Sequence, residues 1–168
     1  DWEKVQQMLE LNVGAVTHLA HGFLPDMLRS KHGAILNVSS LASLLPIPDF
    51  AVYAASKAYV TSFSEALRLE LREHGIPVLA VCPGPVHTGF GETAGRQGAP
   101  KESPSREWFF VPKQEVVLDA LLALQRDQPR TYPGLKVSLL AAGLSILPMA
   151  LIRYLMSHRP RSVSEKDQ

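Results

Sequence analysis

The spacing of apolar residues changes several times along the chain and predicts a succession of different elements. Over residues 1–31 the apolar positions recur at helical spacing, which predicts one long helix or two. Pro25 falls inside this pattern and should kink or restart the helix, and Gly33 is expected to end it. Asn12 interrupts the apolar stripe. It is either a partly exposed polar residue or a side chain that holds a water or bends the helix beside a site.

Two short apolar runs, residues 34–38 and 77–82, are typical of strands that are buried on both faces. Between them, residues 53–73 carry an apolar stripe at helical spacing, with charged side chains on the other face. A strand, a helix and a strand in this order predict a right-handed parallel crossover. Both strands then end on the same side, so the serine pair at 39–40 and the turn at Pro83 should face one crevice. Open α/β sheets bind their ligands at such a crevice.

The second half of the chain predicts fewer regular elements. Residues 88–112 carry no period and predict either a loop over the crevice or disorder. A further amphipathic helix is expected at residues 115–126, and a short last strand within residues 131–134. Residues 159–168 are polar and charged and predict a disordered tail.

An apolar segment at residues 137–152 is broken by Pro148 and flanked by Lys136 and Arg153. Its sixteen residues fall short of the roughly 20 that a helix needs to span a bilayer. We therefore expect helices that pack on the substrate side of the crevice. Contact with a membrane surface is the alternative interpretation.

Composition narrows the range of partners. A formal net charge of +1, with both signs spread along the 168 residues, argues against a nucleic-acid-binding face. The single cysteine, Cys82, excludes an internal disulfide and fits a reducing compartment such as the cytoplasm. His18 and His21 lie at i, i+3, but no third ligand is evident, so no metal site is predicted. The chain starts without a signal-peptide pattern or an initiator Met and opens directly into a helical pattern, which suggests the later part of a longer polypeptide.

Candidate chemistry is concentrated at the start of the helix predicted from residue 53. Tyr53 and Lys57 lie one helical turn apart, with roughly 6 Å between their Cβ atoms. A free tyrosine titrates near about 10, and a neighbouring ammonium should lower the pKa of the phenol towards the range that acid and base catalysis needs. A serine hydroxyl at the end of the preceding strand could hold a substrate oxygen. The Tyr-x-x-x-Lys pair alone is a weak signal, because both residues are common on helices.

Four separated motifs, in this order, resemble the later two-thirds of a short-chain dehydrogenase/reductase. They are Asn12 in Leu11-Asn12-Val13, Ser40 in Asn37-Val38-Ser39-Ser40, the pair Tyr53 and Lys57, and the turn Pro83-Gly84-Pro85-Val86-His87-Thr88. Ser40 precedes Tyr53 by thirteen residues, as in the family. The resemblance implies an α/β fold with a Rossmann-like, doubly wound parallel sheet that is incomplete here. The family's first strands and its Gly-rich turn are missing. It places the catalytic part at residues 1–135 and an apolar helical extension at residues 136–158.

The resemblance also implies a role for each motif. Tyr53 would exchange a proton with the substrate oxygen while hydride passes between a nicotinamide and a ketone or secondary alcohol, and Ser40 would hydrogen-bond that oxygen. Lys57 would lower the pKa of Tyr53 and bind the nicotinamide ribose, and Asn12 would hold a water that links Lys57 to solvent. The turn would hold the nicotinamide through Pro83, Gly84, the Val86 backbone and Thr88. The resemblance implies no catalytic role for His87.

Family analogy favours NADP over NAD and implies a small carbonyl or alcohol substrate, for which the apolar tail favours a lipophilic one. It also implies a homo-oligomer, because the Tyr53 helix and the long helix before Gly33 commonly contact a second subunit in this family. Without the Gly-rich turn and roughly four strands, which would leave an unpaired sheet edge and an exposed core, the 168 residues alone should be inactive and poorly soluble. The alternative function is a non-catalytic half-fold that binds a partner or a membrane through residues 137–152.

Overall fold

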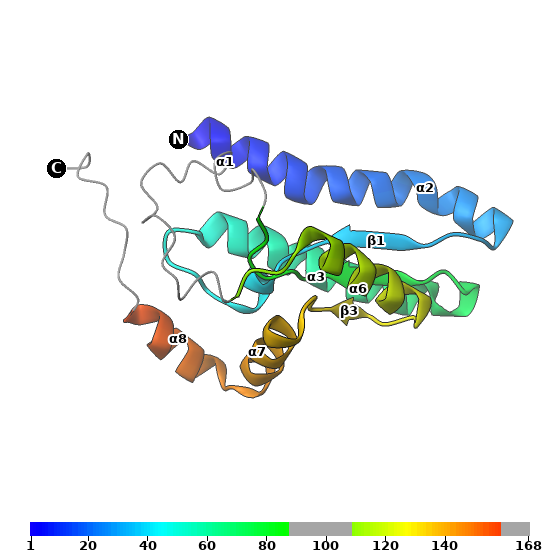
Figure 1. Cartoon of the computed structure of the whole chain (residues 1–168). Helices are drawn as coiled ribbons and strands as arrows, with labels where there is room; N and C mark the ends of the chain where they lie inside the picture. Colours follow the sequence, from blue (N-terminus) through cyan, green and yellow to red (C-terminus); the bar gives the residue numbers. More distant parts are fainter. Residues whose placement is uncertain (88–108, 159–168) are drawn as a thin grey trace.

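The computed structural model describes residues 1–87 and 109–158, which build a parallel sheet with helices on both faces (Figure 1). Its strands are β1 (Ile35–Val38), β2 (Val78–Val81) and β3 (Arg130–Thr131). They lie in the order β1-β2-β3, and both neighbouring pairs are parallel. The predicted α/β class and the parallel pairing of the first two strands are therefore confirmed.

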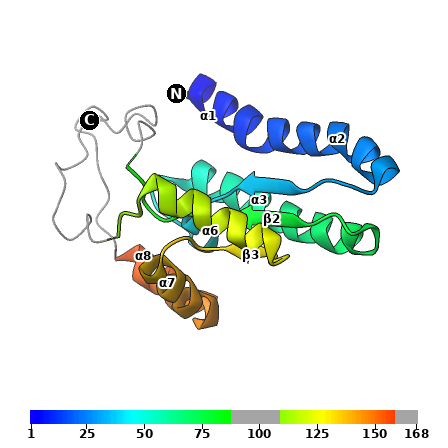
Figure 2. The ribbon, with the colours of Figure 1, turned by 45° about the vertical axis from the view of Figure 1, so that its right-hand side comes forward.

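One helical layer covers each face of the sheet (Figure 2). The first layer contains α1 (Trp2–Leu9), the π-helical segment η1 (Glu10–Ala15), α2 (Val16–Ser30) and α3 (Ala51–Leu71). The opposite face carries α6 (Lys113–Gln125). Short 3-10 turns, η2 (Leu41–Leu44) and η3 (Arg72–His74), flank α3, and the chain continues after β3 into α7 (Leu135–Ile146) and α8 (Met149–Ser157).

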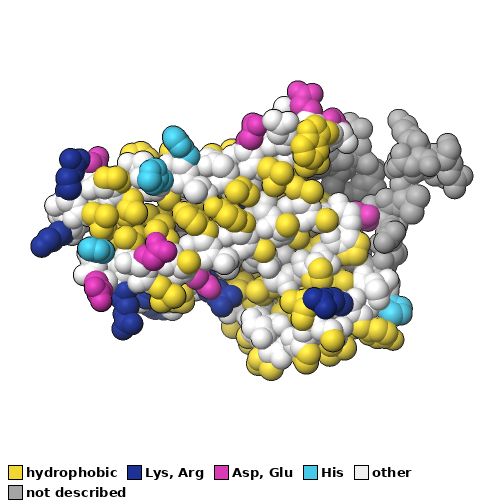
Figure 3. Space-filling model, turned by 180° about the vertical axis from the view of Figure 1, so that it is seen from behind, with side chains coloured by type: hydrophobic (Ala, Val, Ile, Leu, Met, Phe, Trp, Pro, Cys, Tyr) yellow, Lys and Arg dark blue, Asp and Glu magenta, His cyan; other side chains and the backbone are white. Residues whose placement is uncertain are grey.

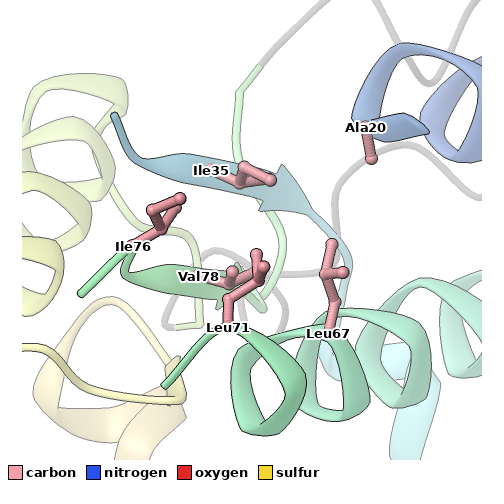
Figure 4. Close-up of a cluster of buried hydrophobic side chains, with 6 residues drawn as sticks. All are labelled: Ala20, Ile35, Leu67, Leu71, Ile76 and Val78. Carbon is pink, nitrogen blue, oxygen red and sulfur yellow. The ribbon is translucent and has the colours of Figure 1, made fainter. Parts of the chain in front are cut away.

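Strand β2 alternates between the two layers, because successive side chains of a strand point to opposite faces. Val78 joins a cluster with residues of α2, α3 and β1 (Figure 4). Leu79 and Val81 pack against Ala120 and Ala123 of α6. All four residues of β2 are buried, as the sequence predicted.

Strand β1 corrects the prediction that both strands are buried on both faces. Ile35 is buried in the core, but Leu36 is 37% exposed and Val38 56% exposed. The physical reason is the position of β1 at the edge of the described sheet, where α6 covers β2 but no described helix covers the Leu36 side of β1.

The N-terminal helical region also differs from prediction. Pro25 lies inside α2, so it does not restart the helix. Gly33 does not cap it either, because α2 ends at Ser30 and its C-cap is Lys31, which itself adopts the left-handed conformation with φ 52°. The irregularity falls instead at Asn12, inside the π-helical segment. Asn12 is half-buried there.

Two apolar helices follow β3. Val137 and Ala141 are buried on one side of α7. The chain bends by 114° between α7 and α8. Within the described residues no single helix is long and apolar enough to cross a membrane, although the bent pair meets the length and composition test. The predicted loop at 88–112 lies mostly outside the described residues, and the predicted tail at 159–168 lies outside them entirely.

Candidate active site

The ends of β1 and β2 meet at the point where the sequence placed the candidate chemistry. The Ser39 amide donates to the Val81 carbonyl at 2.7 Å, and the Leu41 amide donates to the Pro83 carbonyl at 2.9 Å. The loop after β1 is therefore joined directly to the turn after β2. The predicted neighbourhood of the serine pair and the Pro83 turn is confirmed.

Ser39 and Ser40 occupy different environments although they are adjacent. Ser39 is buried, and its Oγ bonds the Lys57 carbonyl at 2.8 Å and Thr61 Oγ1 at 2.7 Å. Ser40 is half-buried, and its Oγ accepts the Ala42 amide at 3.1 Å, which caps η2. Since that bond uses a lone pair of Ser40, its O–H can still donate to another oxygen.

Helix α3 brings Tyr53 and Lys57 together in its first two turns. Lys57 Nζ lies 5.9 Å from the centroid of the Tyr53 ring, and both side chains are half-buried. Nζ also donates to the Val38 carbonyl at 3.0 Å, which ties the lysine to the end of β1. The predicted proximity of ammonium and phenol is present.

Burial shifts the pKa values of Lys57 and Cys82. Desolvation lowers the pKa of Lys57, and the charge of Cys82 opposes that shift. Desolvation also raises the pKa of the Cys82 thiol, although the Thr61 hydrogen bond acts in the other direction. Cys82 is fully buried, which fits an inert thiol in the core.

A hydrogen bond to Ser56 joins Asn12 to α3. Ser56 was not among the residues that the sequence singled out. The Asn12 Nδ2 donates to Ser56 Oγ at 3.0 Å, and Ser56 Oγ in turn donates to the Tyr53 carbonyl at 2.8 Å. Ser56 is 2% exposed. The one available signal was a serine three residues after Tyr53, which returns to the same side of a helix.

The turn after β2 is held on two sides. A Cβ added to Gly84 would lie 2.7 Å from Val137 Cγ2, so α7 packs directly against the glycine backbone. Val86 forms a parallel bridge with Val111, and the Val111 amide donates to the Pro85 carbonyl at 3.0 Å. Thr88 lies outside the described residues.

Within residues 1–87 and 109–158, no group of three His, Cys, Asp or Glu side chains could hold a metal ion. The candidate site consists of Asn12, Ser40, Tyr53 and Lys57. Ser40, Tyr53 and Lys57 provide two hydroxyl groups and an ammonium near the carboxyl ends of parallel strands, which is where open α/β sheets bind ligands. Asn12 adds an amide that is bonded to the Tyr53 helix through Ser56.

Comparison with known proteins agrees with this arrangement. The family model described as short chain dehydrogenase matches residues 1–98. The very-long-chain 3-oxoacyl-CoA reductase of Anas platyrhynchos is 30% identical over 152 residues, which are 90% of this chain and 45% of that protein. The chain thus spans less than half the length of this relative.

Solved structures show the same fold over nearly the whole chain. A short-chain dehydrogenase from Sphingobium yanoikuyae in complex with NADPH is 29% identical with a TM-score of 0.72, covering 100% of this chain and 61% of that one. A short chain dehydrogenase from Burkholderia cenocepacia in complex with NADP is also 29% identical, with a TM-score of 0.74, covering 95% of this chain and 61% of that one. The predicted Rossmann-like fold, present here in part, is confirmed. A family match over more than half of the 168 residues means that the chain belongs to the short-chain dehydrogenase family.

Proposed function

We propose that this chain carries the catalytic part of an NAD(P)-dependent oxidoreductase that interconverts a ketone and a secondary alcohol. The observation that carries the proposal is the placement of Tyr53, Lys57 and Ser40 beside the joined ends of β1 and β2. The family membership supports it, and so do the NADP(H) complexes of the two structural neighbours.

Tyr53 is the proposed acid and base. In the reductive direction its hydroxyl gives a proton to the substrate oxygen, and in the oxidative direction it takes one from the alcohol. The nearby ammonium of Lys57 stabilises the negative charge that remains on the Tyr53 oxygen. Ser40 donates its O–H to the substrate oxygen while Ala42 keeps the hydroxyl oriented.

The described residues fit a nicotinamide cofactor. Lys57 has three N–H donors and gives one to the Val38 carbonyl, so two can bind the hydroxyls of a ribose. Pro83, Gly84 and Val86 line the adjacent turn, where backbone groups would hold the carboxamide together with Thr88. When bound, the nicotinamide supplies or accepts the hydride. Nothing in these residues separates NADP from NAD, and NADP is proposed from the neighbours.

Asn12 is the proposed end of a proton path. Its amide bonds Ser56, which holds the Tyr53 carbonyl, so the π-helical segment is fixed to the helix that carries the acid and base. Asn12 can then hold a water beside Lys57. In the reductive direction Lys57 passes a proton to the Tyr53 oxygen after Tyr53 has given its own proton to the substrate, and Lys57 takes a proton back from solvent through this water. The proposed substrate is a lipophilic ketone, for which the activity in the name of the Anas platyrhynchos relative is a model.

The test is Tyr53→Phe in the native polypeptide, assayed with NADPH and a 3-oxoacyl thioester. Turnover should fall about 10²–10⁴-fold, because the proton donor is removed. NADPH affinity, measured by fluorescence titration, should change little. Tyr59→Phe is the matched control on the same helix, since the Tyr59 hydroxyl bonds Thr17, and it should keep wild-type turnover. Full turnover in Tyr53→Phe would remove Tyr53 from the mechanism.

A further inference from the structure

The two helices after β3 expose more apolar surface than their contacts with the rest of the molecule use. Val137 and Ala141 are fully buried against the domain. The outer side of α7 is apolar as well, and α8 continues the same character. Exposed fractions are 75% for Leu135, 65% for Leu139, 84% for Ile146, 62% for Tyr154 and 50% for Leu155. We call these five residues the C-terminal apolar surface.

A helix that is apolar on all sides is normally covered on all sides. Scattered single leucines need no explanation, but an apolar surface of this kind marks contact with a protein or a membrane. Figure 3 shows hydrophobic side chains over the lower part of the molecule, where Figure 1 places α7 and α8.

The charged side chains carried by α7 and α8 have one sign. No carboxylate side chain occurs between Asp127 and Glu165. The basic residues of these two helices are Lys136 in α7 and Arg153 in α8. Arg153 lies within α8 and is exposed. Two apolar helices that carry basic but no acidic side chains complement an anionic lipid headgroup layer. A described carboxylate near α7, Asp119 of α6, is held by the Gly134 amide at the start of α7.

Two other occupants fit less well. A further strand would pair with a free edge of the sheet through backbone groups, whereas the C-terminal apolar surface consists of side chains on two helices. A second copy of this chain would bring the same basic residues against one another, and like charges in contact disfavour association.

We propose that the C-terminal apolar surface docks on an anionic lipid bilayer and lies in its interface. The 114° bend between α7 and α8 suits two short helices resting on a surface, and no single described helix is long enough to cross it. Val137 packs against Gly84, so this surface is joined directly to the turn of the candidate active site. The proposal concerns location and does not depend on catalysis.

The test is co-sedimentation of the native polypeptide with vesicles of phosphatidylcholine alone and of phosphatidylcholine mixed with phosphatidylserine. Wild type should bind the mixed vesicles, and added salt should weaken the binding. The double variant Leu139→Glu with Ile146→Glu should reduce partitioning at least about tenfold, because charged side chains replace apolar ones that enter the interface. Leu69→Glu is the matched control, since Leu69 is 72% exposed on α3, and it should bind as wild type does.

A second pair of variants tests the charge. Arg153→Gln should weaken binding to the mixed vesicles about fivefold, the effect of one basic residue near an anionic surface. Arg126→Gln at the end of α6 should have no effect. This pair decides the question if circular dichroism shows that the double variant does not fold.

Three results would overturn the proposal. The first is no sedimentation of wild type with mixed vesicles. The second is equal loss in the Leu69→Glu control. The third is wild-type binding by both Arg153→Gln and the folded double variant. If wild type ignores vesicles but forms a dimer that the double variant separates, a second copy covers the surface instead.

Discussion

At the scale of single residues, Ser39 and Ser40 show how neighbours can serve different purposes. Ser39→Ala should lower the free energy of unfolding by about 1–3 kcal/mol, because the buried Lys57 carbonyl and Thr61 hydroxyl both lose a partner. Ser40→Ala should lower it less, by roughly 0.5–1 kcal/mol, since it removes the cap of one short 3-10 turn. Urea denaturation of both variants measures the difference.

Turnover should rank the two variants in the opposite order, so that the variant that loses less stability loses more activity. Ser40→Ala should lose most of its turnover, and folded Ser39→Ala should keep most of it, because the proposed mechanism assigns the bond to the substrate oxygen to Ser40 and not to the buried Ser39. Equal turnover losses in two folded variants would contradict this division. The sequence alone offers two adjacent serines, and only the course of α3 over the end of β1 decides which of them is buried.

Lys57 should make stability depend on pH. Burial lowers its pKa in the folded protein, so between that pKa and the ordinary value the unfolded chain holds a proton that the folded chain has released. Stability should therefore rise with pH across this window. Below the window Lys57 is charged in both states, and the cost of burying the charge is fully present.

Lys57→Met should remove this rise, and the measurement is the denaturation midpoint at neutral pH and near pH 10 in both proteins. Lys4→Met, which removes an exposed lysine of α1, serves as the control and should keep the wild-type difference. An unchanged pH dependence in Lys57→Met would mean that burial does not perturb the lysine.

At the scale of elements, the contact between α7 and the Pro83 turn predicts a sharp asymmetry between two glycines. In Gly84→Ala the new Cβ would meet Val137 Cγ2 at 2.7 Å, and the β-branched Val137 is fully buried and cannot easily turn away. We expect a loss of about 1–3 kcal/mol from overpacking. Gly143→Ala is the matched control within α7 and has open space around its Cβ. It should stabilise the helix by about 0.5–1 kcal/mol.

Thermal melts of the two variants test this contact. Equal stability of Gly84→Ala and wild type would mean that α7 is not seated against the turn. Reduced cofactor affinity in a folded Gly84→Ala protein is also expected, because the turn shifts with the helix.

The elements that the sequence predicted well are those whose pattern reflects local burial. Strand β2 is buried on both sides and α3 presents one apolar stripe, so their periods survive in the fold. The errors arose where a tertiary effect outweighed the local signal. Pro25 lies within a continuous α2, and Lys31 takes the left-handed position for which Gly33 was the better candidate.

In the candidate site, too, the contacts within one element were predicted and those between distant elements were not. The Tyr53 and Lys57 pair is local to one helix, so its spacing predicted its geometry. The bond from Asn12 to Ser56 joins positions 44 residues apart and depends on how the π-helical segment meets α3. Spacing carries no information about such a contact.

At the scale of the whole molecule, the open edge of β1 determines whether the isolated 168-residue chain stays monomeric. Ile35 and Ser39 donate to β2, so the backbone groups of Leu36 and Val38 point the other way in a parallel strand. No described strand pairs with that edge, and Lys57 occupies the Val38 carbonyl there. The candidate site and the free edge are therefore neighbours.

The isolated 168-residue chain should consequently self-associate and show no oxidoreductase activity. An unpaired edge with exposed apolar side chains is a template for pairing with another chain, and a charge on the edge suppresses such pairing. Leu36→Lys should therefore reduce association of the isolated chain in sedimentation velocity. Leu69→Lys, which charges a more exposed position on α3 away from the edge of the sheet, should not. A cooperative melt of a monomeric wild-type chain would contradict the prediction, because it would show that the edge of β1 is stable without a partner.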